Sequence, residues 1–316
     1  MWKSTTRSRG SALAFAVGAV VFLVLAACAG SPSMPVQATH ATSTATATEA
    51  VPTATATFGP AHYMQVTLAH GFGSPDDLAL DAQGRIVFAD SVNGGVYRVE
   101  ANGQVTRLIG GLSAPEGVLP LPDGSLLITV QGFPGATRDE IVRLAPGASS
   151  VTLFASFPNT TGSVGLDSIS RDAATGAILA ADSPNGVVYR LSPDGRQRTL
   201  VASGFTRPVD AITDGVGNIY VADEYGFTVV KIAVDGTRTT LAHMSYPDDL
   251  AFDVDGSLLV TELGHNTLER IDPATGRSLG TVATNLLEPQ GLAVDARGNL
   301  YIAEERGNVI VELRRE

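Results

Sequence analysis

The chain has 316 residues, of which 44% are hydrophobic, and carries a formal net charge of −11 at pH 7. This length and composition can bury a large core, and helix-like periodicity is scarce, so we expect a nearly all-β protein. The acidic balance argues against a nucleic acid as partner, because binding to a phosphate backbone needs a basic face.

Residues 1–28 have the pattern of a secretory signal. A basic segment is followed by an apolar run and by Leu-Ala-Ala-Cys, which ends at Cys28, the only cysteine of the chain. This ending is similar to the lipobox of bacterial lipoproteins, which implies cleavage before Cys28 and a lipid on its sulfur. We therefore expect a lipid-anchored protein outside the cytoplasm, in the periplasm or at the cell surface, that touches the membrane only through this anchor.

Residues 29–58 are rich in threonine, alanine and proline. Such a composition predicts a flexible, low-complexity stalk that holds the folded part away from the membrane. Residues 59–316 are the expected folded domain.

This domain contains six related segments. Their equivalent marker residues are Pro75, Pro115, Gly165, Pro208, Pro247 and Pro289, spaced 39 to 50 residues apart. Each segment predicts four short strands separated by glycine turns, as in "SPDDLALDAQGRIVFAD" and "YPDDLAFDVDGSLLVTE". Four strands in about forty residues is the period of a β-propeller blade.

The last segment stops after three strands, and the strand-like stretch 63–72 precedes the first segment. We therefore expect the N-terminal stretch to supply the missing outer strand of the sixth blade, which removes two open sheet edges. The predicted fold class is an all-β, six-bladed propeller.

Two acidic columns begin the inner strands. The first contains Asp76, Glu116, Leu166, Val209, Asp248 and Gln290, and the second contains Asp77, Gly117, Asp167, Asp210, Asp249 and Gly291. Neighbouring strand residues point to opposite faces, so one column should face the axis and the other should pack between blades. Carboxylates that converge on an axis repel one another unless a cation compensates, and oxygen ligands suit calcium or magnesium. We expect a divalent metal, calcium first; the alternative is solvated carboxylates in a water-filled channel.

A third acidic set ends the second strands. It contains Asp90, Asp182, Asp223, Glu262 and Glu304, with Gln131 in the second segment. These ends lie on the same face of the ring as the starts of the inner strands, because the two strands are antiparallel. The set can form the rim of a site, but its main expected role is to accept hydrogen bonds from the tight loops that follow.

The segments from Pro75 onward resemble the six-bladed propellers of the senescence marker protein and gluconolactonase family, and "GNIYVAD" is also similar to NHL repeats. The resemblance implies an axial divalent metal held by an early acid, an asparagine and an inner-strand aspartate that also acts as general base. By position these are Asp76, Val209 followed by Asp210, and Asp248. The candidate metal ligands are therefore Asp76, Glu116, Asp210 and Asp248, and the implied activity is lactone hydrolysis with Asp248 activating water.

Two other functions remain open. "VTELGHNTLERID" is similar to the repeats of streptogramin lyases, which have a catalytic histidine, and His265 is the candidate base. Alternatively, the protein is a non-catalytic, NHL-like scaffold whose insertions at 131–140 and 157–165 bind a ligand or a surface protein. In each case we expect a monomer whose partner is a small-molecule substrate or a surface protein.

Overall fold

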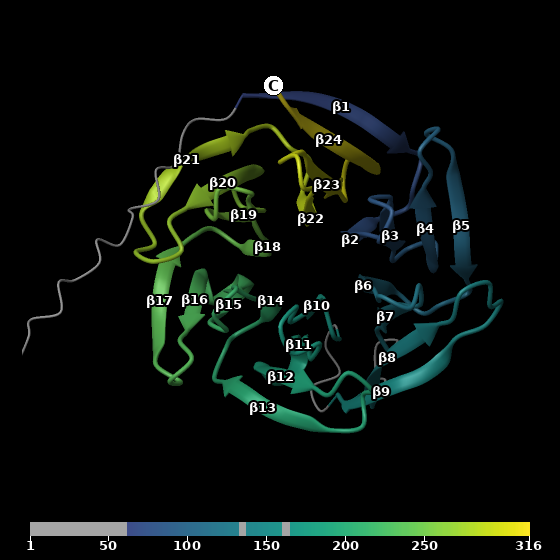
Figure 1. The fold of residues 1–316 in the computed structure, drawn as a ribbon, viewed down its shortest axis with the longest axis horizontal. Helices are drawn as coiled ribbons and strands as arrows, with labels where there is room; N and C mark the ends of the chain where they lie inside the picture. The colour runs from purple at the N-terminus through teal and green to yellow at the C-terminus, as the bar shows by residue number, and fades with distance from the viewer. Residues whose placement is uncertain (1–61, 133–136, 160–164) are drawn as a thin grey trace, which may run out of the picture. The chain divides into compact units, whose positions relative to one another are not determined.

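The computed structural model describes residues 62–132, 137–159 and 165–316, so the predicted signal with Cys28 and the stalk lie outside the described residues. The described part forms six four-stranded antiparallel sheets, arranged around a central axis (Figure 1). This confirms the predicted all-β, six-bladed propeller. No helix in these ranges has the length and apolar character needed to cross a membrane.

The blades follow the order of the chain, and in blades 1 to 5 the strand numbers increase from the inside outward. Blade 1 consists of β2 (Pro75–Leu80), β3 (Ile86–Asp90), β4 (Gly95–Val99) and β5 (Val105–Gly110). Blade 2 consists of β6 (Pro115–Pro120), β7 (Leu126–Val130), β8 (Arg138–Leu144) and β9 (Thr152–Pro158). Blade 3 consists of β10 (Ile169–Arg171), β11 (Ile178–Asp182), β12 (Val187–Leu191) and β13 (Arg198–Ser203).

Blade 4 consists of β14 (Pro208–Thr213), β15 (Ile219–Asp223), β16 (Thr228–Ile232) and β17 (Arg238–His243). Blade 5 consists of β18 (Pro247–Phe252), β19 (Leu258–Glu262), β20 (Thr267–Ile271) and β21 (Ser278–Ala283). Blade 6 consists of β22 (Pro289–Val294), β23 (Leu300–Glu304), β24 (Val309–Arg315) and β1 (Tyr63–His70). Two short 3-10 helices, η1 (Ser183–Asn185) and η2 (Glu224–Gly226), follow β11 and β15.

The sixth blade closes the ring with the N-terminal strand. β1 pairs antiparallel with β24, from Tyr63 opposite Arg315 to His70 opposite Val309. In Figure 1, β1 accordingly lies along the strand that ends at the C-terminus. The predicted closure by residues 63–72 is therefore confirmed.

The core lies between neighbouring blades. The second strands β3, β11, β15 and β19 are buried at every residue. They read as continuous apolar runs rather than alternating ones because adjacent blades cover both faces of each sheet. Between blades 1 and 2, for example, Val87 and Ala89 pack with Val118 and Ile128. This burial of apolar surface is the main force that holds blade to blade.

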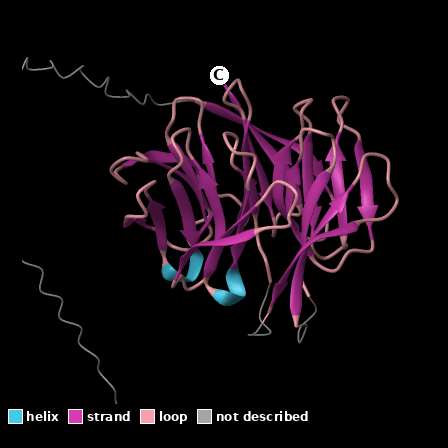
Figure 2. Ribbon diagram, turned by 60° about the horizontal axis from the view of Figure 1, so that its bottom comes forward, coloured by secondary structure: helices cyan, strands magenta, loops and turns pink. Residues whose placement is uncertain are grey.

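The inner strands of five blades begin with a β-bulge, and this bulge sets the direction of the side chains at the candidate site. The register between the first two strands shifts between Pro75 and Leu78 in blade 1, and at the equivalent place in blades 2, 4, 5 and 6. The residues inside the bulge leave the regular ladder, so their side chains are redirected. These bulges and the ends of the second strands lie on one face of the ring, here called the site face, which also carries η1 and η2 (Figure 2).

Candidate functional site

In the third blade, the structure corrects the sequence alignment by one residue. Thr129 Oγ1 donates to the backbone oxygen of Asp167 at 2.9 Å, as Thr261 Oγ1 donates to that of Gln290 at 3.1 Å. Asp167 therefore belongs to the first column, whereas Leu166, assigned there from the sequence, is fully buried in the core. The marker equivalent in this blade is Leu166 rather than Gly165.

A second shift of one residue concerns Gln131. Pro115 pairs with Val130 just as Pro75 pairs with Asp90, so Val130 ends the second strand and Gln131 follows it. The position after the strand end is the one that reaches the axis. Its occupants are Ser91, Gln131, Ser183, Glu224, Leu263 and Glu305.

Seven charged side chains meet at the axis on the site face, and we call them the axial cluster. They are Asp76, Glu116, Asp167, Arg207, Glu224, Asp248 and Glu305. Arg207 donates from Nη2 to Asp167 Oδ2 at 3.0 Å and from Nη1 to Glu224. Glu305 accepts from Ser74 Oγ at 2.5 Å and from Gln290 Nε2 at 2.8 Å. The structure thus brings the predicted Asp76, Glu116 and Asp248 together with four residues that were not predicted for the site.

The axial cluster has a deficit of positive charge, because six carboxylates face one guanidinium. Burial, followed by repulsion from Asp167, raises the pKa of Asp76, of Glu116 and of Asp248 well above their usual values. Arg207 opposes this rise in all three. An ionised carboxylate here is a stronger proton acceptor than one in water, which suits a general base.

The second column ties the blades together. Asp77 accepts from Val118 N at 3.1 Å, Asp210 from Leu250 N at 3.1 Å, and Asp249 from Leu292 N at 2.5 Å, each donor lying on the next blade. We call these three aspartates the interblade set. Burial raises their pKa values, and in Asp249 repulsion by Asp210 adds to the effect.

The predicted ligand Asp210 is thus separated from the other three. It is 2% exposed and bridges blades 4 and 5, because consecutive residues of the bulge point to different neighbours. Val209, at the asparagine position of the resemblance, is also 2% exposed and packs in the core.

The acids that end the second strands bond the tight loops that follow them, as Asp182 does with Asn185, or the loops that lead to the inner strands. Asp90 accepts from Gly73 N at 2.9 Å and Ser74 N at 3.0 Å, and Asp223 accepts from Arg207 N at 2.8 Å. The remaining members are Asp182, Glu262 and Glu304, and all three are buried. Because the loops that lead to the inner strands carry Ser74 and Arg207, these acids position the axial cluster without joining it.

His265 lies away from the axis. Its side chain is 69% exposed, and Nδ1 lies 3.0 Å from Glu262 Oε2, which raises the pKa of the imidazole. It lines a cleft of about 510 Å³ with His243 of β17 in blade 4 and Glu269 of β20 in blade 5. The structure therefore does not bring His265 to the carboxylates that a catalytic base would have to serve.

The sequence contains a signal for the residues that were missed. Glu224 and Glu305 directly follow the acids Asp223 and Glu304, so each belongs to an acidic pair at a strand end. Arg207 directly precedes the marker Pro208. Where a bulge or a turn ends the alternation of side chains along a strand, the residues on both sides of a repeat position are therefore candidates for the site.

The donor chemistry of the axial cluster fits a hard divalent cation. Asp76, Glu116, Asp167 and Asp248 offer carboxylate oxygens, which calcium and magnesium prefer. As the side chains stand, no group of three acidic, histidine or cysteine side chains within the described ranges is arranged to hold a metal ion. Attraction to a bound cation would have to draw the carboxylates inward against their mutual repulsion.

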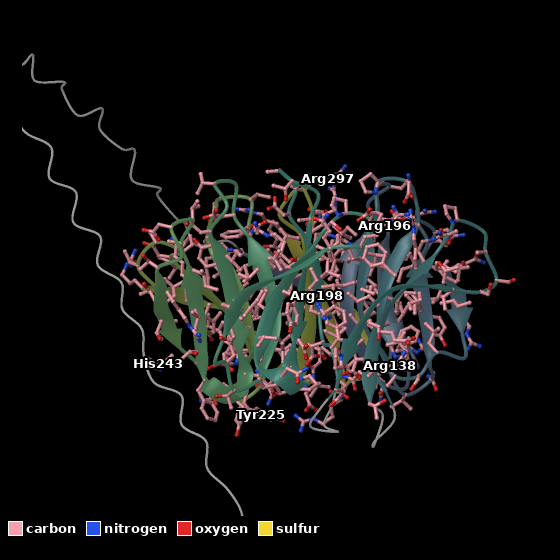
Figure 3. All side chains as sticks on the ribbon, turned by 90° about the horizontal axis from the view of Figure 1, so that it is seen from below. Arg138, Arg196, Arg198, Tyr225, His243 and Arg297 are labelled. Carbon is pink, nitrogen blue, oxygen red and sulfur yellow. The ribbon has the colours of Figure 1, made fainter. Side chains whose placement is uncertain are left out.

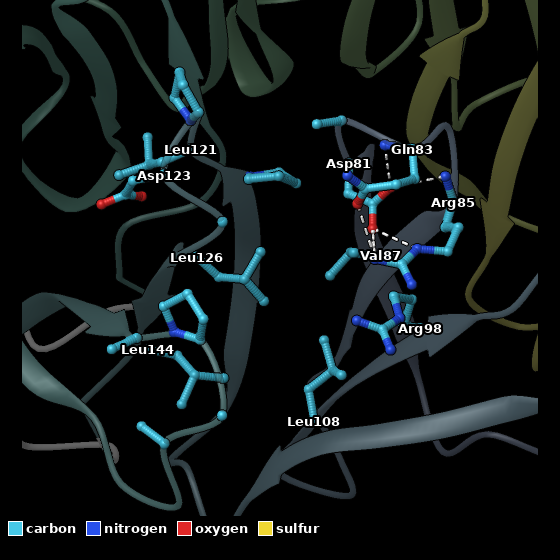
Figure 4. A pocket seen from close by; sticks show the side chains of 18 of the residues that line it. Asp81, Gln83, Arg85, Val87, Arg98, Leu108, Leu121, Asp123, Leu126 and Leu144 are labelled. Atoms are coloured by element: carbon cyan, nitrogen blue, oxygen red, sulfur yellow. Dashed lines mark hydrogen bonds and ion pairs between the residues drawn. The ribbon is translucent and has the colours of Figure 1, made fainter.

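A second cavity, of about 680 Å³, lies on the opposite face between blades 1 and 2 (Figure 4). Its lining includes Arg85, which is paired with Asp81 at 2.7 Å. At the corresponding place between blades 4 and 5, the rings of Tyr220 and Phe252 pack edge to face at 5.3 Å and line a smaller cavity of about 390 Å³. The smaller Val87 at the position of Tyr220 leaves the cavity open in blade 1.

Comparisons with known proteins identify the architecture. No protein-family model matches the sequence, and a search of curated proteins finds no match. Among solved structures, a gluconolactonase from Xanthomonas campestris has a TM-score of 0.67 at 20% identity, over 80% of this chain and 90% of that one. Regucalcin from Agrobacterium tumefaciens, described as a calcium-binding protein, has a TM-score of 0.65 at 13% identity, over 79% and 93%.

Virginiamycin B lyase from Staphylococcus aureus is similar at a TM-score of 0.58 and 16% identity, over 80% of this chain and 98% of that one. At these identities the similarity shows the fold alone. The chain thus shares the propeller fold of these structures, and its chemistry has to be argued from its own site.

Proposed function

We propose that the chain is a hydrolase of small lactones or esters that uses a divalent cation, calcium first, at the axial cluster. The observation that carries this proposal is the set of six carboxylates facing one guanidinium on the axis. Gluconolactonase and the calcium-binding regucalcin share the architecture, which supports the choice of reaction and ion. The ligands would be Asp76, Glu116, Asp167 and Asp248, and a bound cation supplies polarisation of the ester carbonyl.

The side chains of the axial cluster can carry the remaining steps. Asp248 accepts a proton from the attacking water and returns it to the alkoxide that leaves when the ester bond breaks. Arg207 Nε is buried and has no acceptor within the described residues, so its N–H can donate to the oxyanion of the tetrahedral intermediate. Asp167 and Glu224 hold the guanidinium in place for this role.

A calorimetric titration of calcium into the metal-stripped, full-length chain tests the cation. We expect binding near one equivalent, lost in Asp248→Asn and kept in Asp194→Asn, a matched change at an exposed turn. Absence of heat with calcium, magnesium, manganese and zinc would refute a metal-dependent site.

The hydrolase is tested separately, with a panel of lactones and esters. We expect turnover that Asp248→Asn abolishes and that Asp194→Asn retains. Calcium binding without turnover of any compound would leave a binding propeller, which is the alternative function.

We also propose, on the sequence alone, that the mature chain is a monomer anchored by a lipid at Cys28 outside the cytoplasm, with a small molecule as its partner. An extracytoplasmic compartment supplies calcium at higher concentrations than weak carboxylate sites require. The site therefore does not need a preassembled set of ligands to be loaded there.

A further inference from the structure

Three exposed aromatic residues form a continuous surface on the site face. We call Tyr225, Phe227 and Tyr246 the aromatic platform; they are 50%, 43% and 39% exposed. Phe227 packs edge to face on Tyr246 at 4.8 Å, and Tyr225 does so at 6.1 Å. Figure 3 shows Tyr225 at the site face, opposite the face that carries Arg196 and Arg297.

Two of these three residues have a left-handed backbone conformation, which is unfavourable for a bulky side chain. Phe227 has a φ of 56° and Tyr246 a φ of 57°. At the position of Phe227 the other blades with the same loop have Gly94, Gly186, Asn266 and Asn308, with φ between 55° and 63°. Glycine and asparagine tolerate this region and a bulky residue does not. Phe227 thus has a conformational cost that its partial burial offsets only weakly. This points to a role of the ring in function.

The aromatic platform borders the axial cluster. The guanidinium of Arg207 lies 5.1 Å from the centre of the Tyr225 ring. Tyr225 directly follows Glu224, and Tyr246 lies two residues before Asp248. A ligand resting on the rings would therefore extend one end into the axial carboxylates.

The charge of the axial cluster selects the ligand. Six carboxyl groups lie beside one guanidinium, so acidic groups outnumber basic ones where the ligand would end. An organic cation gains from the π faces of tyrosine and phenylalanine as well as from the carboxylates. A neutral sugar gains from contact with the rings and from hydrogen bonds to the carboxylates, but it lacks the attraction between opposite charges.

We infer that the aromatic platform holds an ammonium group of the ligand, so that the substrate class is a lactone or ester that carries an organic cation. The assignment of an ester or lactone group to the ligand rests on the proposed function. Recognition of the ammonium group does not, because it needs only the platform and the surrounding charge.

Choline and its neutral isostere 3,3-dimethylbutan-1-ol test the inference, by calorimetry on the full-length chain. Choline should bind at least about tenfold more tightly than the isostere, and Tyr225→Ala and Tyr246→Ala should each weaken choline by about tenfold. Calcium binding should be unchanged in both variants. Equal affinity for the two compounds, or no choline binding by the wild-type chain, would overturn the inference.

Phe227→Gly separates a ligand-binding role from a structural one. It introduces the residue that blades 1 and 3 carry, so relief of the backbone should raise Tm while choline binds more weakly. A lower Tm with unchanged choline affinity would make Phe227 a structural residue and contradict the inference. Choline binding without calcium binding or hydrolysis would refute only the proposed function, and calcium binding without choline binding would refute only the platform.

Discussion

Asp248 lies where burial and neighbouring carboxylates both disfavour its charge, so its pKa is raised well above 3.8. A carboxyl group whose pKa is higher in the folded than in the unfolded chain holds its proton more tightly when folded. Its contribution to stability is therefore present at low pH and is lost as pH rises through the folded pKa. Asp76 and Glu116 share this sign.

We predict that the metal-free, full-length chain loses this contribution as pH rises from about 4 toward neutrality. Asp248→Asn removes one ionising group, so its Tm relative to the wild type should increase with pH, as measured by thermal unfolding at low salt. At Asp81 burial alone would raise the pKa, but hydrogen bonds from Arg85 and Gln83 outweigh it and lower the pKa. Asp81→Asn should therefore show the opposite trend, at pH values below about 4, and little dependence on pH above it. If Tm relative to the wild type depended on pH in the same way in both variants, the raised pKa assigned to Asp248 would be contradicted.

Individual site residues were predictable to the extent that strand alternation holds. Asp76, Glu116 and Asp248 were named from their position after the marker, and the structure places them in the axial cluster. Asp210 stands one position later, in the second column, and is a candidate ligand only through the resemblance. It lies in the interblade set, as Asp77 and Asp249 of that column do, while Val209 in the first column packs in the core. A single sequence does not show which of two neighbouring residues a bulge turns inward.

At the scale of elements, the repeat predicted the strands well because each blade carries its own glycine turns. Gly103, Gly195 and Gly236 have positive φ at the turns expected for them. The alignment failed where the repeat is interrupted, since blade 3 is entered by a long connection and β10 has only three residues. There the one-residue error moved Asp167 from the axis to the wrong column.

The β1 closure gives a prediction at this scale. Ala69 is 4% exposed and packs with Phe88 and Ile310 between blades 6 and 1, whereas Thr67 on the same strand is exposed. Ala69→Glu should lower the free energy of unfolding by about 3 kcal/mol or more, because it buries an unpaired charge. Thr67→Glu should change it by no more than about 0.5 kcal/mol. Denaturant unfolding measures both; equal small effects would mean that β1 does not hold the ring closed.

The ring of six blades brings residues that are far apart in the sequence to one axis. Ser74 and Glu305 form a hydrogen bond although 231 residues separate them in the chain. Every blade starts an inner strand at this place, so each can contribute one side chain while the interblade aspartates hold the blades in register. The site therefore depends on closure of the ring. All residues of the axial cluster lie on the ring, so we expect the site to be independent of a membrane anchor.

This independence leads to a prediction for Cys28. If residues 1–28 are a lipoprotein signal, growth with radiolabelled fatty acid should label the wild-type chain in the membrane fraction and leave Cys28→Ser unlabelled. The variant should keep the wild-type Tm and calcium heat, because Cys28 precedes the predicted folded domain in the sequence. A wild-type chain without lipid would refute the anchor and leave the site intact. A variant that loses calcium binding along with the lipid would instead show that the anchor and the propeller are coupled.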